Sequence, residues 1–312
     1  MERRTLLYAG GITVAAFLFS FVMIYRIEAN KNRQNHYGPA PSGVLQRVVA
    51  LSPGIAEIVV ALGGKEQLAG ITEHTNHPPG ISDKKTIVGG FLSPSLERIV
   101  SLRPDLVIMR SEQTEFADRL ESIGIRVLKV PDAGISDVIY SIRLIGEALG
   151  RKEQAGKLAT EADDRLKVVE KAVRRRLAET GEDRTKGLFI VGRSDGGLRS
   201  MYAASSFTLP HSILEAAGGL NAIRDSIARY PVVSAETVIS IAPRVIFEVV
   251  TPPSVVSPRN ALKSWNSLDV VPAIVDGRVH VLESDMYLIP GPRVIEGVEN
   301  LARLLYPGIE LE

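Results

Sequence analysis

A serine, an aspartate and a histidine occur in an order that some hydrolases use. The run Gly192-Arg193-Ser194-Asp195-Gly196 matches the G-x-S-x-G nucleophile elbow, a sharp strand-to-helix turn that presents a reactive serine. Asp276 and His280 follow it in the chain order Ser, Asp, His, which would allow a hydrolytic triad. A serine hydrolase that uses Ser194 is therefore one hypothesis for this chain.

Two features of the sequence speak against that hydrolase. The residues after the serine, Gly196-Gly197-Leu198-Arg199, have the composition of a loop, whereas an elbow must lead directly into a helix. His280 lies inside an apolar run, Val279 to Leu282, that is typical of a strand. Because short motifs often match by chance, we expect a binding protein without catalytic residues rather than an enzyme.

Two histidines stand in a polar loop, Glu73-His74-Thr75-Asn76-His77-Pro78-Pro79. Together with Tyr230 and Tyr287, His74 and His77 are of the side-chain types that ligate haem iron. A histidine in such a loop is more commonly a hydrogen-bonded loop residue. No three histidines and a carboxylate stand at the spacing of a zinc or manganese site, so we expect no directly bound metal ion.

Composition excludes several classes of protein. The chain has 312 residues, 45% of them hydrophobic, which is enough for one large or two ordinary domains. Lys and Arg number 37 against 36 Asp and Glu, so nucleic acid is not an expected partner. The absence of cysteine excludes disulfides, iron-sulfur clusters, thiolate zinc sites and a lipid attached to an N-terminal cysteine.

An apolar run near the N-terminus, Leu6 to Tyr25, is flanked by Arg3-Arg4 and Arg26. It is close to the roughly 20 residues that a helix needs to cross a bilayer, and it is longer than the apolar part of a cleaved signal peptide. We predict a transmembrane anchor or a signal segment at residues 1–29; the uncleaved anchor is favoured, and a buried apolar helix is the alternative. The prolines and polar residues that follow predict a linker over residues 30–46.

From Arg47 onward, short apolar runs alternate with helical patterns. Because strands that alternate with helices form parallel sheets covered on both faces, we predict doubly wound α/β structure. The predicted strands are Val48 to Leu51, Leu68 to Thr72, Asp105 to Met109, Arg126 to Val130, Leu188 to Val191, Arg244 to Val249 and Val279 to Leu282. The predicted helices are Ile55 to Leu62, Ser95 to Leu102, Glu115 to Ile123, Ser136 to Leu149, Ser212 to Ala217, Glu236 to Ile241 and Val294 to Leu305.

One helical pattern is much longer than the others. Over residues 151–180 only Gly156 interrupts it, and its apolar residues repeat every three or four positions. We predict one rigid connecting helix between an N-terminal lobe, residues 47–150, and a C-terminal lobe, residues 181–312. Since ligands of open α/β sheets bind beyond the carboxyl ends of the strands, a ligand cleft is expected between the lobes.

Several short motifs are distributed over residues 47–307. They are Arg47 to Pro53 with Glu57, Leu96 to Ile108, Ala217-Gly218-Gly219-Leu220-Asn221, Gly277-Arg278-Val279 and the turn Pro290 to Arg293. In these motifs the chain resembles the substrate-binding proteins of ABC importers for cobalamin, haem and ferric siderophores, whose two lobes are joined by a single helix. Each motif alone is weak, but their order and spacing are typical of the family.

The resemblance implies which residues contact the ligand. Phe91 takes the place of the aromatic that reaches the corrin ring in cobalamin-binding members, His74 that of a second aromatic and Tyr230 that of a third. Tyr287 lies in the last cleft loop, and His77 belongs to the same loop as His74. Flat side chains suit a broad macrocycle because they bury much area with little loss of rotamer entropy. If the ligand is haem, His74 or Tyr287 could ligate its iron.

The resemblance also implies two contacts with a membrane permease. In the family, one glutamate near the start of a helix in each lobe binds arginines of the permease, and Glu97 and Glu236 match those places. A carboxylate at a helix N-terminus is held by the helix dipole and can bind arginine through both oxygens. On sequence alone Ser95 and Ser234 could equally be N-caps, with the two glutamates merely completing the first turn.

These observations lead to one hypothesis with alternatives. The chain is expected to be a monomeric, extracytoplasmic protein that is held to the membrane by its N-terminal helix. We expect it to bind cobalamin or a related metal chelate and to deliver this ligand to an ABC permease and its ATPase. Haem or a ferric siderophore is the alternative ligand within the same family, and no intrinsic cofactor is expected. A membrane-tethered sensor or scaffold of the same fold is the alternative from another class.

Overall fold

The computed structural model describes residues 46–252 and 254–312 of the chain. The anchor predicted for residues 1–29, and all but the last residue of the linker predicted for 30–46, lie outside these residues. Within the described ranges, no helix combines the length and the apolar character that crossing a membrane requires.

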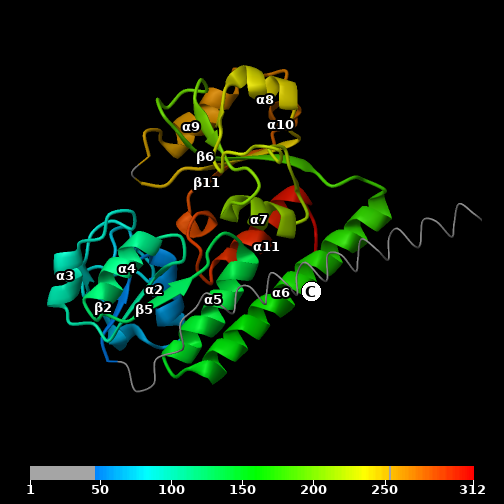
Figure 1. The fold of residues 1–312 in the computed structure, drawn as a ribbon. Coiled ribbons are helices and arrows are strands. Elements are labelled where there is room, and N and C mark those ends of the chain that lie inside the picture. Colours follow the sequence, from blue (N-terminus) through cyan, green and yellow to red (C-terminus); the bar gives the residue numbers. More distant parts are fainter. Residues whose placement is uncertain (1–45, 253) are drawn as a thin grey trace, which may run out of the picture. The chain divides into compact units, whose positions relative to one another are not determined.

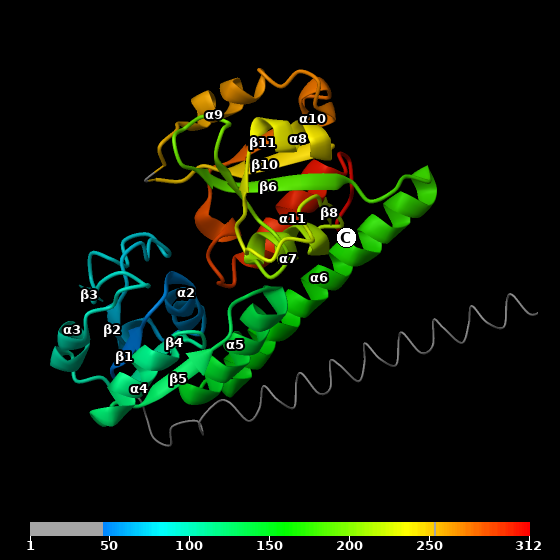
Figure 2. The same cartoon turned by 45° about the horizontal axis from the view of Figure 1, so that its top comes forward.

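The first sheet is entirely parallel, with the strand order β3-β2-β1-β4-β5 (Figures 1 and 2). Alternating residues of β1 face opposite layers: Val48 and Ala50 contact the helices on one face, and Val49 contacts those on the other. The strands are β1 Val48–Ala50, β2 Leu68–Ile71, β3 Thr86–Ile87, β4 Leu106–Arg110 and β5 Val127–Val130. Helices α2 Pro53–Ala61 and α5 Ile135–Ala148 cover the first face, helices α3 Leu96–Ser101 and α4 Thr114–Ser122 cover the second, and η1 Lys65–Gln67 precedes β2.

The second sheet has the order β11-β10-β6-β7-β9, with β8 also paired to β6. Strands β8, β6, β10 and β11 are parallel, whereas β7 runs antiparallel to both β6 and β9. The strands are β6 Lys186–Arg193, β7 Met201–Ala203, β8 Leu220–Asn221, β9 Val232–Val233, β10 Val245–Val249 and β11 Val279–Leu282. Helices α7 Leu209–Ala216 and α11 Val294–Leu305 cover one face of this sheet (Figure 2). The other face is covered by helices α8 Ala235–Ile241, α9 Pro258–Trp265 and α10 Pro272–Val275. A short 3-10 helix, η2 Asp285–Tyr287, follows β11.

Helix α6, Lys152–Thr180, joins the two lobes and has 29 residues. It ends at Gly181, whose φ of 67° gives the left-handed C-cap that glycine adopts at little cost. Along its first half it packs against α5 (Figures 1 and 2). A Cβ at Gly146 of α5 would overlap the side chain of Ala155, so this glycine permits the two helices to approach closely.

The hydrophobic core is continuous across the junction of the lobes. One cluster of buried side chains extends from β1 and α2 of the first lobe through α5 and α6 to α7, α11 and β10 of the second. Val169 of α6 is fully buried in it, and Val173 is nearly so. The lobes are therefore joined by packed helices as well as by the chain itself.

The predicted architecture is confirmed: two α/β lobes, mainly parallel sheets and one long connecting helix. The short strands β7 and β9 were not predicted, and they make one edge of the second sheet antiparallel. They have three and two residues, too few for an alternating pattern to emerge from the sequence. Helices α9 and α10 were missed as well, since a proline at the first turn of each gives the segment the composition of a loop.

A buried ion pair fixes the end of β6. The Arg193 guanidinium donates from Nε and Nη2 to the two carboxylate oxygens of Glu248, each at 2.6 Å, and neither side chain is exposed. Trp265 Nε1 donates to the same carboxylate at 2.7 Å. Since each group has partners, the desolvation of both charges is compensated, and the cluster ties β6, β10 and α9 together.

Replacing Glu248 by Gln should lower the free energy of unfolding by about 3–5 kcal/mol, because it leaves the Arg193 charge buried without a counter-charge. The matched control is Glu170→Gln, which removes the same charge from an exposed ion pair with Arg174 and should cost less than about 1 kcal/mol. Urea unfolding followed by circular dichroism measures both. Equal midpoints for the two variants would contradict the role given to the buried pair.

Candidate binding site between the lobes

A cavity of about 450 Å³ lies between the carboxyl ends of the two sheets. Its volume falls within the range of small-molecule sites, and residues of both lobes line it. The first lobe supplies Ser52, Pro53, His74, Phe91, Arg110, Glu112 and Asp132, and the second supplies Leu209, Arg229, Tyr230, Leu288, Ile289 and Pro290. The ligand cleft predicted between the lobes is therefore present.

Three of the five predicted ligand contacts line this cavity: His74, Phe91 and Tyr230. His74 follows β2 and has a φ of 62°, an uncommon conformation for a residue other than glycine. Phe91 is 38% exposed, and the backbone that carries it is held by Gln113, whose Nε2 donates to the Phe91 carbonyl at 2.6 Å. Tyr230 is 43% exposed, and the burial of its hydroxyl end raises the pKa of this phenol.

The other two predicted contacts lie elsewhere. Tyr287 is only 3% exposed; its ring centroid is 6.3 Å from that of Phe189, and its hydroxyl group is hydrogen-bonded to Asn300. Tyr287 was predicted in the last cleft loop; its ring lies in the hydrophobic core and is not among the residues that line the cavity. His77 is half-buried beside Glu57 and does not line the cavity either.

Four charged side chains in the cavity wall were not singled out from the sequence. Arg110 Nε donates to Asp132 at 2.5 Å, and Arg110 Nη2 donates to Glu112 at 3.1 Å. Arg229 of the other lobe donates from Nη1 to both oxygens of Glu112, at 2.9 and 3.2 Å. We call Arg110, Glu112, Asp132 and Arg229 the charged quartet. Burial raises the pKa of Asp132, and the adjacent Arg110 guanidinium opposes that rise.

A signal for the quartet existed in the sequence. Arg110 is the last residue of β4 and Glu112 follows shortly, while Asp132 comes two residues after β5. These positions lie beyond the carboxyl ends of parallel strands, where ligand sites form. The quartet also holds Phe91, because the guanidinium carbon of Arg110 lies 5.9 Å from the centre of that ring.

An exposed aromatic stands beside the cavity in the second lobe. Phe207 is 72% exposed and has a φ of 71°, which is strained for a bulky side chain. Its carbonyl accepts a hydrogen bond from Arg229 Nε at 3.1 Å. The next residue, Thr208, caps α7 by accepting from the His211 backbone N–H. The backbone of Phe207 is thus held by Arg229, a member of the charged quartet.

A second contact between the lobes joins α2 to the residue before α11. The carboxylate of Glu57, in α2, accepts two hydrogen bonds from Arg293, which precedes α11; the one from Nε measures 3.0 Å. Arg293 Nη1 also contacts Asp285 Oδ1 at 2.9 Å. Nearby, the Pro290 backbone passes so close to Gly54 that a Cβ there would overlap it. These contacts hold the two lobes together beside the cavity.

The two glutamates predicted to bind a permease are exposed, one on each lobe. Glu97 lies in the first turn of α3, and Glu236 lies in the first turn of α8. Ser95 and Ser234 cap these helices by accepting hydrogen bonds from backbone N–H groups. The serines are therefore N-caps, and both glutamate carboxylates remain at the surface. Hydrogen bonds from Ser234 and from its own backbone N–H lower the pKa of Glu236.

The G-x-S-x-G motif does not form a nucleophile elbow. β6 ends at Arg193, and the chain then passes through a loop into the antiparallel strand β7 rather than into a helix. Ser194 Oγ donates to the Ser200 carbonyl at 3.3 Å. His280 lies in β11 with its ring stacked on Phe247. The motif therefore builds a turn between strands, as its two following glycines indicated.

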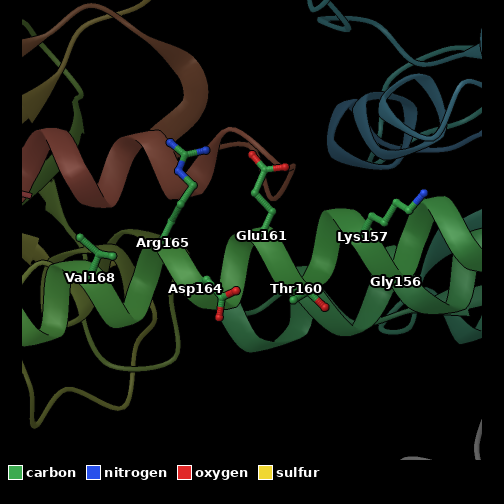
Figure 3. A pocket seen from close by; sticks show the side chains of 7 residues that line it. All are labelled: Gly156, Lys157, Thr160, Glu161, Asp164, Arg165 and Val168. Atoms are coloured by element: carbon green, nitrogen blue, oxygen red, sulfur yellow. The ribbon is translucent and has the colours of Figure 1, made fainter. Parts of the chain in front are cut away.

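A larger hollow, of about 660 Å³, lies along helix α6 (Figure 3). All of its lining residues belong to this one helix, and Lys157, Glu161 and Arg165 point to the same side. Lys157 and Arg165 are paired with Glu153 and Glu299. The hollow is thus a solvated helix face rather than a site. Among residues 46–252 and 254–312, no group of three histidines or carboxylates is placed to hold a metal ion.

Comparison with known proteins agrees with this geometry. Residues 48–255 match the periplasmic binding protein family. The ABC transporter substrate-binding lipoprotein YvrC of Bacillus subtilis is 30% identical over 84% of this chain and 80% of its own length. The vitamin B12-binding protein of Pectobacterium carotovorum is 26% identical over 83% of this chain and 88% of its own length.

Among solved structures, the periplasmic heme-binding protein RhuT of Roseiflexus, in its apo form, superposes with a TM-score of 0.71. The two sequences are 26% identical, and the match covers 85% of this chain and 98% of the other. The paired α/β lobes, the connecting helix, the cavity between the sheets and the match over residues 48–255 together show that this chain belongs to the periplasmic binding protein family.

Proposed function

We propose that this protein is the extracytoplasmic substrate-binding component of an ABC importer and that it binds cobalamin or a related metal-chelate macrocycle. The observation that carries the proposal is the cavity between the sheets, which is lined by His74 and Phe91 of one lobe and by Tyr230 of the other. Flat side chains on two opposed walls suit a planar, bulky guest, because each ring face covers a large apolar area. The relatives bind compounds of this kind, as the vitamin B12-binding protein and the heme-binding protein do.

Haem or a ferric siderophore is the second candidate, and His74 is the observation that favours haem. Its imidazole lines the cavity and is an iron ligand in many haem proteins. Tyr287, by contrast, is too deeply buried to reach a ligand in the cavity.

We further propose that the protein works outside the cytoplasm and is held to the membrane by a helix within residues 1–29. The apolar run Leu6 to Tyr25 supports this. The relative YvrC is a lipoprotein, which needs a cysteine for its lipid. This chain has no cysteine, so a helix would supply the tether instead.

Binding titrations test the ligand directly. Purified protein should show saturable binding of cyanocobalamin, measured by isothermal titration calorimetry, and weaker binding of haemin and of ferric hydroxamates. If haemin binds best and its Soret band shifts, the haem alternative replaces the corrinoid, and His74→Ala should then abolish the shift. Saturable binding of none of these compounds would remove the proposal.

Substitution of two tyrosines separates ligand contact from core packing. Tyr230→Ala should weaken ligand binding about tenfold or more and change stability by less than about 1 kcal/mol, because its ring is half exposed. Tyr287→Ala should lower the free energy of unfolding by about 3–5 kcal/mol, because it opens a space in the core beside Phe189. Urea unfolding and calorimetry on the same preparations measure both quantities. A normal affinity for Tyr230→Ala would remove this residue from the site.

The permease contact is tested by charge reversal. Glu97→Arg and Glu236→Arg should each weaken co-purification with the cognate permease and its ATPase about tenfold or more, since each would replace an attraction with a repulsion. Ligand affinity should not change, because neither residue lines the cavity. Glu121→Arg, an exposed position on α4, is the matched control. Unaltered complexes with both variants would exclude docking through these glutamates.

A further inference from the structure

The charged quartet occupies the cavity wall with its charges already balanced. The cavity lining has two arginines, Arg110 and Arg229, and two carboxylates, Glu112 and Asp132. Each arginine donates to a carboxylate at 3.2 Å or less, so neither is a vacant cation awaiting an anionic ligand. A ligand that enters the cavity therefore meets alternating donors and acceptors with no net formal charge from these four groups.

This balance discriminates between chelates of similar size. A ligand with carboxylate arms, such as haem with its propionates, competes with Glu112 for Arg229, and it brings its own negative charge next to that carboxylate. Like charges at such short range are unfavourable where water is partly excluded. A ligand fringed with amides avoids this cost, since its carbonyls accept from the arginines and its amide N–H groups donate to the carboxylates.

We propose, resting on the function proposed above, that the charged quartet makes the cavity selective for uncharged, amide-bearing metal macrocycles against carboxylate-bearing ones, with Glu112 as the specificity-determining residue. Glu112 is the member that joins the two lobes, because it accepts hydrogen bonds from Arg110 of the first and Arg229 of the second. Its side chain is 52% exposed, whereas that of Asp132 is 13% exposed. Glu112 can thus exchange partners with a ligand, while Asp132 holds Arg110 in place.

The experiment compares two ligands that share one ring and one metal. Haemin carries free propionates, and its bis-amide derivative carries the same arms as primary amides. Calorimetric titration of the full chain should show tighter binding of the bis-amide than of haemin. Glu112→Gln should raise the affinity for haemin about tenfold or more, because it frees Arg229 for a propionate and a charge-assisted hydrogen bond is worth at least that factor. It should not raise the affinity for the bis-amide or for cyanocobalamin, because their amide N–H groups lose a carboxylate acceptor.

Two controls keep the result interpretable. Glu121→Gln removes the same charge from an exposed site on α4 and should leave the ranking of the ligands unchanged. A second cavity variant, Arg229→Gln, should weaken binding of haemin to Glu112→Gln protein when the two changes are combined. Thermal unfolding by circular dichroism verifies that each variant is folded. We expect Glu112→Gln to fold, because the Glu112 side chain is half exposed.

The outcomes separate this inference from the function on which it rests. If the unaltered protein binds neither cyanocobalamin nor either haem compound, the proposed function itself fails. If it binds cyanocobalamin but prefers haemin to the bis-amide, the selectivity is overturned while the function stands. If Glu112→Gln and Glu121→Gln rank the two haem compounds alike, Glu112 does not determine the specificity.

Discussion

The structure depends on one continuous apolar core at the junction of its lobes. Helices α5, α6, α7 and α11 share buried side chains, so the connecting helix is packed along its length by both lobes rather than spanning a gap alone. Because a close-packed interior resists deformation, the two sheets are held at a defined separation. The ion pair of Glu57 with Arg293 and the close approach at Gly54 add polar and steric contacts beside this core.

This fixed separation explains where the polar chemistry of the protein lies. Apolar contact joins the lobes on the side of α6, and the cavity opens on the side where the carboxyl ends of both sheets face each other. Loops that follow parallel strands carry backbone groups and charged side chains that a core cannot accept. The charged quartet pairs its charges across the cavity, so none of its four members lacks a counter-charge.

Much of the fold was accessible from the sequence because each element carries a local signal. The long helix was predicted within one residue of its observed ends by its apolar spacing. The site was accessible only in part. His74, Phe91 and Tyr230 lie in loops that follow strands or precede a helix, and such loops reach the cavity. The inward direction of Tyr287 depends instead on packing against Phe189, which the residues next to Tyr287 in the sequence do not indicate. The pairing of Arg229 with Glu112 joins residues 117 positions apart, which no spacing rule connects.

The sequence by itself determined the alternation of the longer strands and helices, the connecting helix and the family, because periodicity and terminal residues act over a few turns of chain. Only the tertiary structure decided which loop residues meet. Whether an exposed aromatic faces a ligand or a core, and whether an arginine in the cavity is vacant or already paired, depends on contacts between segments far apart in the chain. Those contacts are fixed by the packing of the lobes and not by the residues next to them.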